Sequence, residues 1–449
     1  MTRRATAAAF PIALTVFAML FFARSFTSYF VADDFFFLNR VDFARVTHYF
    51  SQSLGYGNEY RPVVAYAFAI NAAVSGMSPL GYHVVNTLIH LLNAGLVGLL
   101  ALQAGVAKRV SVSASFIFLL NPVAHECVLW VSGRPGLMGS CFVLGSSCCF
   151  ARAWLSENRR GLLIAGYVLF VLALGSYEVA VVTPILAVLV CRFGGGSFSR
   201  YRRHLAALLL MTGLYVLAWN WLFGFHITRF PVEHSVIGAA TSVVEALKHS
   251  FHGAGRRSIA AVYLLLLTPI LLKKNGWKAV AAASAWFGVA YAPFVLVQGY
   301  ADRFAYLAAA ATAVLLGLAT HEILARSRIA GVLVAVLLFG FFGVDMQKRI
   351  TAWKEAGEIA RSITNDVKTL LPVFPENRLL VLLNVPVMHK GAYVYFTGLD
   401  HALQLTYPGA AIKFTGQLRP YADEGSIILE YSGGRMVARR FDDVKSRYP

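Results

Sequence analysis

Long apolar stretches separated by short charged turns make up the first 344 residues of the chain. Many approach the roughly 20 residues that a helix needs to cross the hydrocarbon of a bilayer, although several are shorter. The pattern predicts an all-α polytopic membrane bundle of about 11 transmembrane helices. The predicted spans are 8–30, 80–104, 109–122, 137–153, 161–176, 178–193, 205–225, 258–272, 278–298, 303–321 and 327–344.

Two domains are expected, with the bundle over residues 1–344. The first span follows two arginines, lacks a small-residue cleavage site and runs into an acidic pair, so we predict a retained helix rather than a signal peptide. A long external loop, residues 31–79, follows it. Charged residues become frequent from Asp345 onward, where an amphipathic helix over about 346–371 precedes β-rich runs and a hairpin around Ser432-Gly433-Gly434. Residues 345–449 are therefore predicted to form a small soluble α+β domain.

The composition supports a membrane protein and orients it. Hydrophobic residues make up 58% of the chain, charged residues 14%, and the mean hydropathy is +0.62, values that exclude an ordinary soluble globule. The net charge of +18 indicates membrane topology and contact with membrane lipids, not nucleic acid, because the basic residues follow the positive-inside pattern. We expect a multi-pass protein of a bacterial inner membrane with a cytoplasmic N-terminus and an extracytoplasmic C-terminal domain. The basic loops predicted to be cytoplasmic contain Lys108 and Arg109; Arg152, Arg159 and Arg160; Arg192, Arg200, Arg202 and Arg203; Lys273, Lys274 and Lys278; and Arg326 and Arg328.

Asp33 and Asp34 form an adjacent pair of carboxylates directly after the first span. Charge is expensive at a membrane segment, so a catalytic role is one hypothesis. The alternative is that the pair ends the segment and caps the next helix. Neighbouring carboxylates raise each other's proton affinity, which would suit a general base.

Four external turns carry further ionisable groups. Because they are all predicted on one face of the membrane, they can converge on a site that holds both acids and guanidinium groups. Helix capping or a structural ion pair is the alternative for each residue. No second histidine follows His125-Glu126 at zincin spacing, and the five cysteines lack metal-ligand spacing. The candidates are Arg61, His125, Glu126, Arg134, Glu178, Asp302 and Arg303.

A polar stripe runs along the second predicted span. His83, Asn86, His90 and Asn93 are three, four and three residues apart, which places them on one helix face. We expect His90 and Asn93 to form hydrogen bonds between helices. His83 is nearest the external surface and is also a candidate for the site.

The order of these motifs resembles the multi-spanning glycosyltransferases of the GT-C superfamily, in particular the protein O-mannosyltransferases with tetratricopeptide tails. The resemblance extends over roughly residues 30–310. It implies a polyprenyl-phosphate-linked sugar as donor and a protein or glycan acceptor on the non-cytoplasmic face. It also implies that the Asp33-Asp34 pair supplies the catalytic carboxylate, and that residues at five further positions line the donor and acceptor pocket. These positions are His125, Glu126, Glu178, Asp302 and Arg303.

The chain departs from the family pattern at three places. Asn121 stands where a histidine is commoner, Tyr177 replaces the lysine expected before Glu178, and no tetratricopeptide repeats follow. The change at Tyr177 removes a cation that could contact the donor phosphate. Because the tail differs, the resemblance does not identify the acceptor. It also does not decide whether a divalent cation takes part, since related transferases differ in this respect.

The chemistry of the implied reaction accounts for the residue types. A lipid phosphate is already a stable leaving group, so one carboxylate base, Asp33 with Asp34 orienting it, suffices for a direct displacement that inverts the anomeric centre. Arg303, supported by Arg61 or Arg134, would neutralise the departing phosphate. The alternatives are a transporter or flippase of a lipid-linked glycan and a non-catalytic scaffold. Against a transporter, the charges gather on one face and no inverted repeat is apparent.

Overall fold

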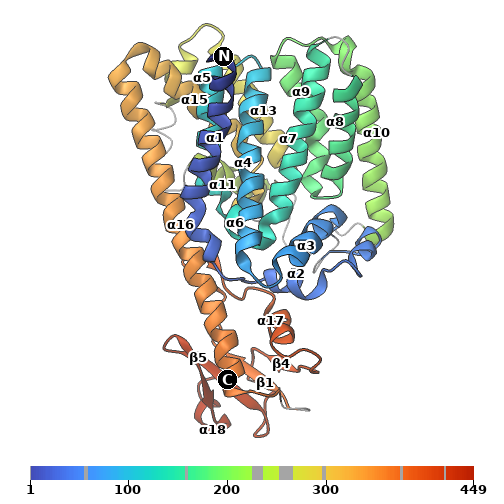
Figure 1. Ribbon diagram of the computed structural model, residues 1–449, viewed down its shortest axis with the longest axis vertical. Helices are drawn as coiled ribbons and strands as arrows, with labels where there is room; N and C mark the ends of the chain where they lie inside the picture. Colours follow the sequence, from blue (N-terminus) through green and yellow to red (C-terminus); the bar gives the residue numbers. More distant parts are fainter. Residues whose placement is uncertain are drawn as a thin grey trace.

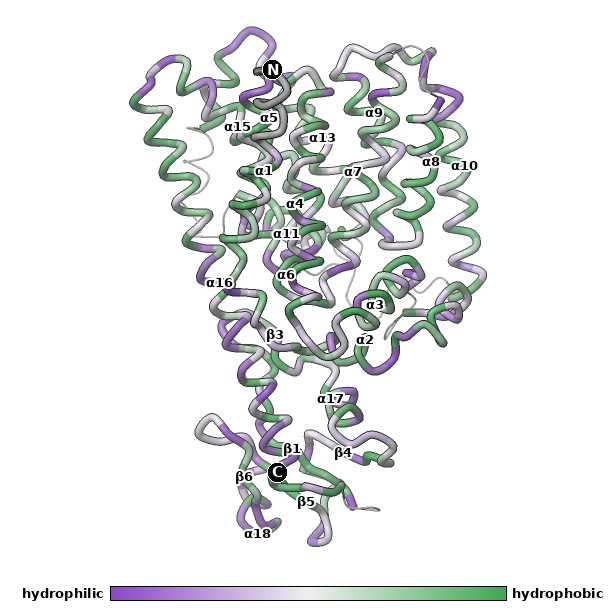
Figure 2. Tube along the Cα trace, viewed as in Figure 1, coloured by the Kyte–Doolittle hydropathy of each residue, from purple (hydrophilic) through white to green (hydrophobic). Residues whose placement is uncertain are grey.

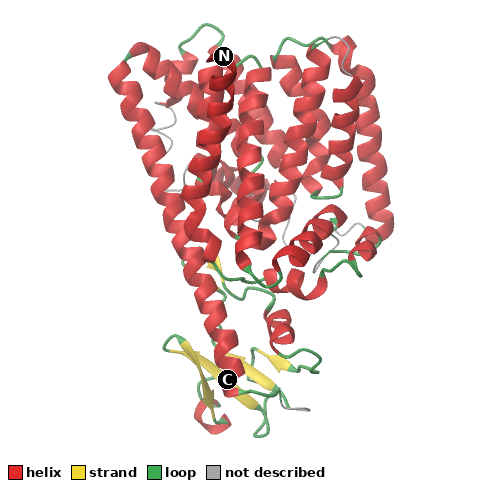
Figure 3. Ribbon diagram, in the orientation of Figure 1, coloured by secondary structure: helices red, strands yellow, loops and turns green. Residues whose placement is uncertain are grey.

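A helical bundle and a small strand-containing domain make up the protein, which is represented here by a computed structural model (Figure 1 and Figure 3). The structure describes residues 2–54, 59–156, 160–224, 236–251, 266–295, 300–374, 378–418 and 421–448. The N-terminus lies at the end of the bundle that is far from the C-terminal domain (Figure 1). Hydrophobic residues run along the bundle helices, whereas hydrophilic residues are frequent at the helix ends and in the C-terminal domain (Figure 2).

Ten of the eleven predicted spans coincide with helices, and most of the remaining one, 258–272, lies outside the described residues. One bundle helix, α11 (Val236–Phe251), was not predicted. Among the described residues, six helices are long and apolar enough to cross a membrane, or seven if one bent pair counts as a single span. The helices at predicted spans are α1 (Thr2–Phe22), α4 (Pro79–Gln103), α5 (Lys108–Leu120), α7 (Arg134–Leu155), α8 (Arg160–Leu174), α9 (Thr183–Phe193), α10 (Phe198–Phe223), α13 (Gly276–Val295), α15 (Ala309–Arg326) and α16 (Arg328–Leu370).

The bent pair consists of α5 and the segment Pro122–Leu129, which includes the short helix α6 (His125–Leu129). Proline cannot continue α5 because it has no backbone N–H, and the Asn121 side chain accepts a hydrogen bond from the N–H of Val123 at 3.1 Å. The chain turns by 50° at this point. The Asn-Pro sequence therefore redirects the chain so that His125 lies on a separate short helix.

The segment predicted as a long external loop contains two helices, α2 (Asp34–Arg40) and α3 (Pro62–Ser75). The first predicted span, 8–30, also ended too late: α1 ends at Phe22, and a 3₁₀ turn, Ala23–Thr27, leads to the acidic pair. These helices are too short to be recognised as spans. Hydropathy alone does not distinguish a short apolar helix from an apolar loop, so the segment was assigned to a loop.

Helix α16 is 43 residues long and connects the bundle to the C-terminal domain (Figure 1). Residue 345, the predicted domain boundary, lies inside this helix. Before it, Val332, Val336 and Leu337 are at least half exposed, as expected for a surface that faces lipid. Beyond it, one face becomes buried at helical spacing and packs on the bundle and on the C-terminal domain. The residues of that face are Met346, Ile350, Trp353, Gly357, Ala360, Ile363 and Val367.

The C-terminal domain holds a four-stranded sheet of order β4-β1-β5-β6. The strands are β1 (Leu380–Leu383), β4 (Phe414–Thr415), β5 (Ile427–Ser432) and β6 (Arg435–Arg439). Strand β1 is parallel to β4 and β5, and the predicted hairpin is the antiparallel pair β5-β6. A small hairpin of β2 (Met388–His389) and β3 (Ala392–Tyr393), followed by α17 (Leu399–Thr406), connects this sheet to the bundle. The predicted α+β character of this domain is confirmed.

Candidate active site

The acidic pair lies where the bundle meets the C-terminal domain, and its two carboxylates differ. Asp34 is 1% exposed and accepts three hydrogen bonds, from the N–H of Val31 at 3.0 Å and from the N–H and hydroxyl of Ser132 at 2.7 and 2.5 Å. Asp33 is only half-buried and accepts a hydrogen bond from the hydroxyl of Thr397. Asp34 is thus bound on both oxygens, whereas Asp33 is the member that remains accessible.

Burial acts on both carboxylates. It raises the pKa of Asp34 to about 7, although the donors from Ser132 and Val31 favour the charged form. Burial also raises the pKa of Asp33, while the Thr397 hydroxyl and the positive charge of Arg303 act in the opposite direction. A raised pKa increases the proton affinity of Asp33, which is the property that a general base requires.

Main-chain contacts join the C-terminal domain to the turn that precedes Asp33 and Asp34. Ala32 has a φ of +46°, and its N–H donates to the carbonyl of Val394 at 2.8 Å. Gly398, with a φ of +77°, lies so close to Ala32 that any Cβ would collide with the Ala32 carbonyl oxygen. The positive φ and the close approach both require glycine at position 398.

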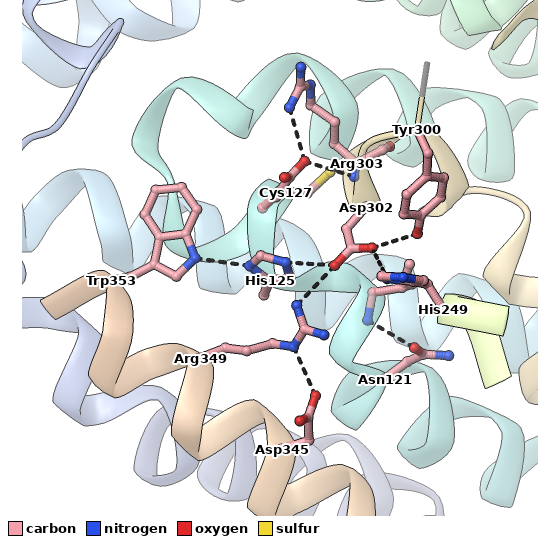
Figure 4. A network of polar contacts seen from close by, with 12 residues as sticks. Asn121, His125, Cys127, His249, Tyr300, Asp302, Arg303, Asp345, Arg349 and Trp353 are labelled. Atoms are coloured by element: carbon pink, nitrogen blue, oxygen red, sulfur yellow. Dashed lines mark hydrogen bonds and ion pairs between the residues drawn. The ribbon is translucent and has the colours of Figure 1, made fainter. Parts of the chain in front are cut away.

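Asp302 is the centre of a buried polar network on α14 (Asp302–Ala305) (Figure 4). One carboxylate oxygen lies 2.7 Å from Nε2 of His125 and 2.9 Å from a guanidinium nitrogen of Arg349. The other lies 2.7 Å from Nδ1 of His249 and 2.5 Å from the hydroxyl of Tyr300. Burial would raise the pKa of Asp302, but the bonds from the two histidines and the charge of Arg349 outweigh it and hold the pKa well below its usual range.

The contacts of His125 determine its tautomer. The indole N–H of Trp353 can only donate, and it points at Nδ1 of His125 at 2.9 Å. Nδ1 must therefore be an acceptor, so the proton is on Nε2 and is donated to Asp302. Two α16 residues, Arg349 and Trp353, thus organise groups that belong to the bundle.

Glu126 and Arg303 form the next pair. The Glu126 carboxylate accepts from the backbone N–H of Arg303 at 3.1 Å and from its guanidinium at 3.0 Å. Tyr393 of β3 bridges them, with its hydroxyl 3.0 Å from the guanidinium. The guanidinium also lies over the rings of Trp130 and Phe304, at 5.6 and 5.0 Å. Among the described residues, only one of its terminal nitrogens makes hydrogen bonds, so donors remain for a ligand.

A cavity of about 220 Å³ opens beside the Asp302 network. Asp33 does not line this cavity. Arg303 connects the two, because its charge acts on Asp33 and its guanidinium donates a hydrogen bond to Glu126, which lines the cavity. The cavity thus combines carboxylates, imidazoles and cations. It is lined by His125, Glu126, His249, Tyr300, Ala301, Asp302, Arg349, Ala352, Trp353, Lys390, Gly391 and Ala392.

Arg61 and Glu178 form a separate, two-pronged ion pair, with N···O distances of 3.1 and 2.9 Å. The guanidinium of Arg61 lies over the ring of Tyr177, 4.9 Å from its centroid. Tyr177 stands where the family pattern has a lysine. A positive charge is still present at this place, because Arg61, from another part of the chain, packs on the Tyr177 ring.

His83 and Arg134 were predicted to bind ligand, but the structure places both inside the protein. His83 is 2% exposed, and its Nε2 lies 3.0 Å from the carbonyl of Ser28. Arg134 is 0% exposed; its guanidinium donates to the side-chain oxygens of Asn86 and Asn71, each at 2.8 Å, and stacks on an aromatic ring. The remaining nitrogens, Nδ1 of His83 and Nη1 of Arg134, are also buried, and neither residue lines the cavity.

His90 and Asn93, the two residues of the polar stripe expected to join helices, behave as predicted. His90 lies 2.7 Å from the hydroxyl of Tyr306 and 3.0 Å from the carbonyl of Leu119, and Asn93 donates to Leu137 and Tyr306. These are hydrogen bonds between helices, as expected for polar groups inside a membrane bundle.

Several residues of the site were not identified from the sequence. Trp353 and Arg349 lie on the predicted amphipathic helix, where they read as ordinary members of its two faces. His249 lies on the unpredicted helix α11. Tyr393 and Thr397 belong to the C-terminal domain, which was expected to be separate. Within the described part of the chain, no group of three or more His, Cys, Asp or Glu side chains is arranged to hold a metal ion.

Comparison with known proteins supports the resemblance. No family model matches the chain. A segment is 33% identical over 116 residues to the human protein O-mannosyl-transferase TMTC4, covering 23% of this chain and 16% of that protein. Another is 32% identical over 143 residues to Drosophila melanogaster protein O-mannosyl-transferase Tmtc1, covering 30% and 15%. The chain thus matches less than a fifth of the length of these relatives.

The fold likeness extends over nearly the whole chain. The crystal structure of ArnT from Cupriavidus metallidurans bound to undecaprenyl phosphate superposes with a TM-score of 0.51 at 13% identity, covering 98% of this chain and 95% of that one. Its apo structure gives 0.52 at 14% identity, with 93% and 87% covered. The predicted GT-C-like architecture and the similarity to protein O-mannosyltransferases are confirmed.

Proposed function

We propose that the protein is an integral-membrane glycosyltransferase that moves a sugar from a polyprenyl-phosphate donor to a protein or glycan acceptor on the non-cytoplasmic face. The observation that carries the proposal is the position of Asp33, a half-buried carboxylate under the electrostatic influence of Arg303, at the junction that also holds the Asp302 network. The names of the relatives support transfer of a sugar to a protein, and the undecaprenyl phosphate bound to ArnT supports a lipid-linked donor.

Asp33 is the proposed general base. Its carboxylate is accessible, its pKa is raised by burial, and Thr397 orients it with a single hydrogen bond. It would accept the proton of the acceptor hydroxyl during a direct displacement that inverts the anomeric centre. Asp34 supports this role by shaping the turn, because its bonds to Ser132 tie the acidic pair to the turn before α7.

Arg303 is the proposed contact for the donor phosphate. Its side chain is 30% exposed, and Glu126 and Tyr393 hold it in place through one terminal nitrogen. The remaining donors can pair with two phosphate oxygens and stabilise the charge that develops on the leaving group. Arg61 is the proposed second cation, since its place over Tyr177 compensates for the lysine missing at that position.

A transporter of a lipid-linked glycan remains the competing hypothesis, and the described interior argues against it. Asn86, His90 and Asn93 of α4 each make a hydrogen bond to another part of the bundle, which favours a structural role for them. The test is a reconstitution of purified protein in proteoliposomes with a polyprenyl-phosphate sugar and externally added acceptor. Transfer that is lost in Asp33→Asn supports the proposal. Movement of intact lipid-linked sugar across the bilayer, without transfer and unaffected by Asp33→Asn, would contradict it.

A further inference from the structure

A second cavity lies at the opposite end of the bundle from the candidate active site. Its volume is about 520 Å³, and α4, α5, α9, α13 and α15 all contribute to it. It exists because small side chains meet where these helices converge, among them Ala101, Ala283, Ala310 and Ala311. The volume falls within the range of roughly 300–1,000 Å³ that is typical of small-molecule sites.

The chemistry of this cavity is that of an amphiphile site. Its walls are apolar, and its polar residues are confined to the ends of α13 and α15 and the turn before α13: Lys273, Asn275, Lys278, His321 and Glu322. Lys273 is neutralised by Glu322, since their charged atoms lie 2.6 Å apart. Lys278 is exposed and makes no ion pair with another described residue, so the residues that line the cavity keep one positive charge at its mouth.

The surroundings of the mouth indicate the level of a lipid headgroup. Trp277, 60% exposed, has its ring 6.0 Å from the ammonium of Lys278, and Leu271 and Leu272 beside them are 48% and 72% exposed. Exposed tryptophan next to lysine is typical of a membrane–water interface. The mouth lies at the end of the bundle that holds the N-terminus, which the charge distribution predicts to be cytoplasmic, the side where anionic lipids attract basic residues.

We infer that this cavity binds one anionic phospholipid, with an acyl chain between α4, α9, α13 and α15 and its phosphate at Lys278. An apolar void open to a bilayer is filled by a lipid chain at lower cost than by water, because water there would find few polar partners. The cation at the mouth then favours an anionic headgroup. The site is independent of the proposed transferase function, because it lies at the other end of the bundle.

The test is a lipid titration of the purified, delipidated full-length protein, followed by native mass spectrometry. The probes are phosphatidylglycerol and phosphatidylcholine with identical chains. For the first bound lipid we expect about a fivefold preference for phosphatidylglycerol, the effect of one lysine near a lipid surface. Lys278→Gln should abolish the preference. Lys108→Gln, which removes an exposed charge that the cavity lining does not include, should retain it.

A second variant tests the apolar part of the site. Ala283→Phe places a ring in the void and should weaken the first binding event for both lipids. Undiminished binding by this variant would place the lipid elsewhere. Equal affinity of the parent for the two lipids, or an equal loss in Lys278→Gln and Lys108→Gln, would overturn the inference. Displacement of phosphatidylglycerol by an equimolar polyprenyl phosphate would overturn the choice of occupant. Should Ala283→Phe fail to fold, the two lysine variants still decide.

Discussion

The indole nitrogen of Trp353 lies 2.9 Å from Nδ1 of His125, and this contact fixes which nitrogen of the imidazole carries the proton. The relationship joins two parts of the chain 228 residues apart. Trp353 belongs to the half of α16 that was expected to be part of a separate domain. The geometry of His125 and Asp302 therefore depends on how α16 packs against the bundle.

Trp353→Phe should loosen the His125–Asp302 contact without emptying the core. The lost hydrogen bond predicts a decrease of about 0.5–1.5 kcal/mol in the free energy of unfolding, together with slower transfer. Thermal unfolding and initial rates on the same preparation measure both effects. Trp277→Phe, at an exposed site at the other end of the bundle, is the control and should change neither. An unaltered rate in Trp353→Phe would show that the tautomer does not matter for transfer.

Asp33→Asn and Asp34→Asn should fail in different ways. Asp33→Asn removes the base and should reduce transfer by about 10²–10⁴-fold with little change in stability. Asp34→Asn places an amide among donors that require an acceptor, so the main expected effect is a loss of about 1–3 kcal/mol in folding stability. Product assays and melting curves at matched amounts of inserted protein separate the two. If Asp33→Asn transfers sugar as the parent does, the carboxylate is a structural cap and the proposed mechanism is wrong.

The rate of transfer should rise with pH through the pKa of Asp33, because only the carboxylate accepts a proton. Since burial raises that pKa, the acidic limb of the kcat/KM profile should lie above the usual range of aspartate. Thr397→Val removes a hydrogen bond that lowers the pKa, so the limb should move to higher pH while the plateau changes little. Thr406→Val, on α17, is the control. A limb that stays in place in Thr397→Val would assign it to another group.

Arg303→Ala should raise the KM for the lipid-linked donor and slow transfer, and Arg303→Lys should restore only part of the activity because lysine lacks the two-pronged geometry. Donor titrations with both variants, each checked by thermal unfolding, measure this. Arg303 also forms an ion pair with Glu126, so its removal can disturb that carboxylate. A matched Glu126→Gln variant therefore shows how much of the effect is structural. Normal donor kinetics in Arg303→Ala would direct attention to Arg61 and Arg349.

Reporter fusions test the orientation of the bundle. Those placed after Arg203 and Lys274 should report a cytoplasmic location, and those after Glu59 and Arg440 an external one, because of the positive-inside pattern. A cytoplasmic result at Arg440 would place the proposed transfer on the wrong side of the membrane.

Hydropathy predicted most of the bundle because a helix that crosses a bilayer needs a long apolar stretch, and such a stretch is visible in the sequence without knowledge of its neighbours. It did not predict α11 or the two short helices after the first span, whose place depends on packing. The structure brings together His125 with Asp302 and Glu126 with Arg303, as expected, whereas Arg61 and Glu178 pair separately. Arg134 was assigned wrongly, because the sequence does not distinguish a buried guanidinium that donates to two asparagines from one that faces a ligand.

The unbroken course of α16 has a consequence for insertions and deletions. A helix turns by about 100° per residue, so one extra residue between Val344 and Asp345 would rotate Trp353 and Arg349 away from the bundle together. Four extra residues would bring the angular phase back to within about 40°, but would displace the C-terminal domain by about 6 Å along the axis. Neither change alters a single side chain of the site. The spacing between the lipid-facing half of α16 and Trp353 is therefore as strict a requirement as the identity of any residue in the cavity.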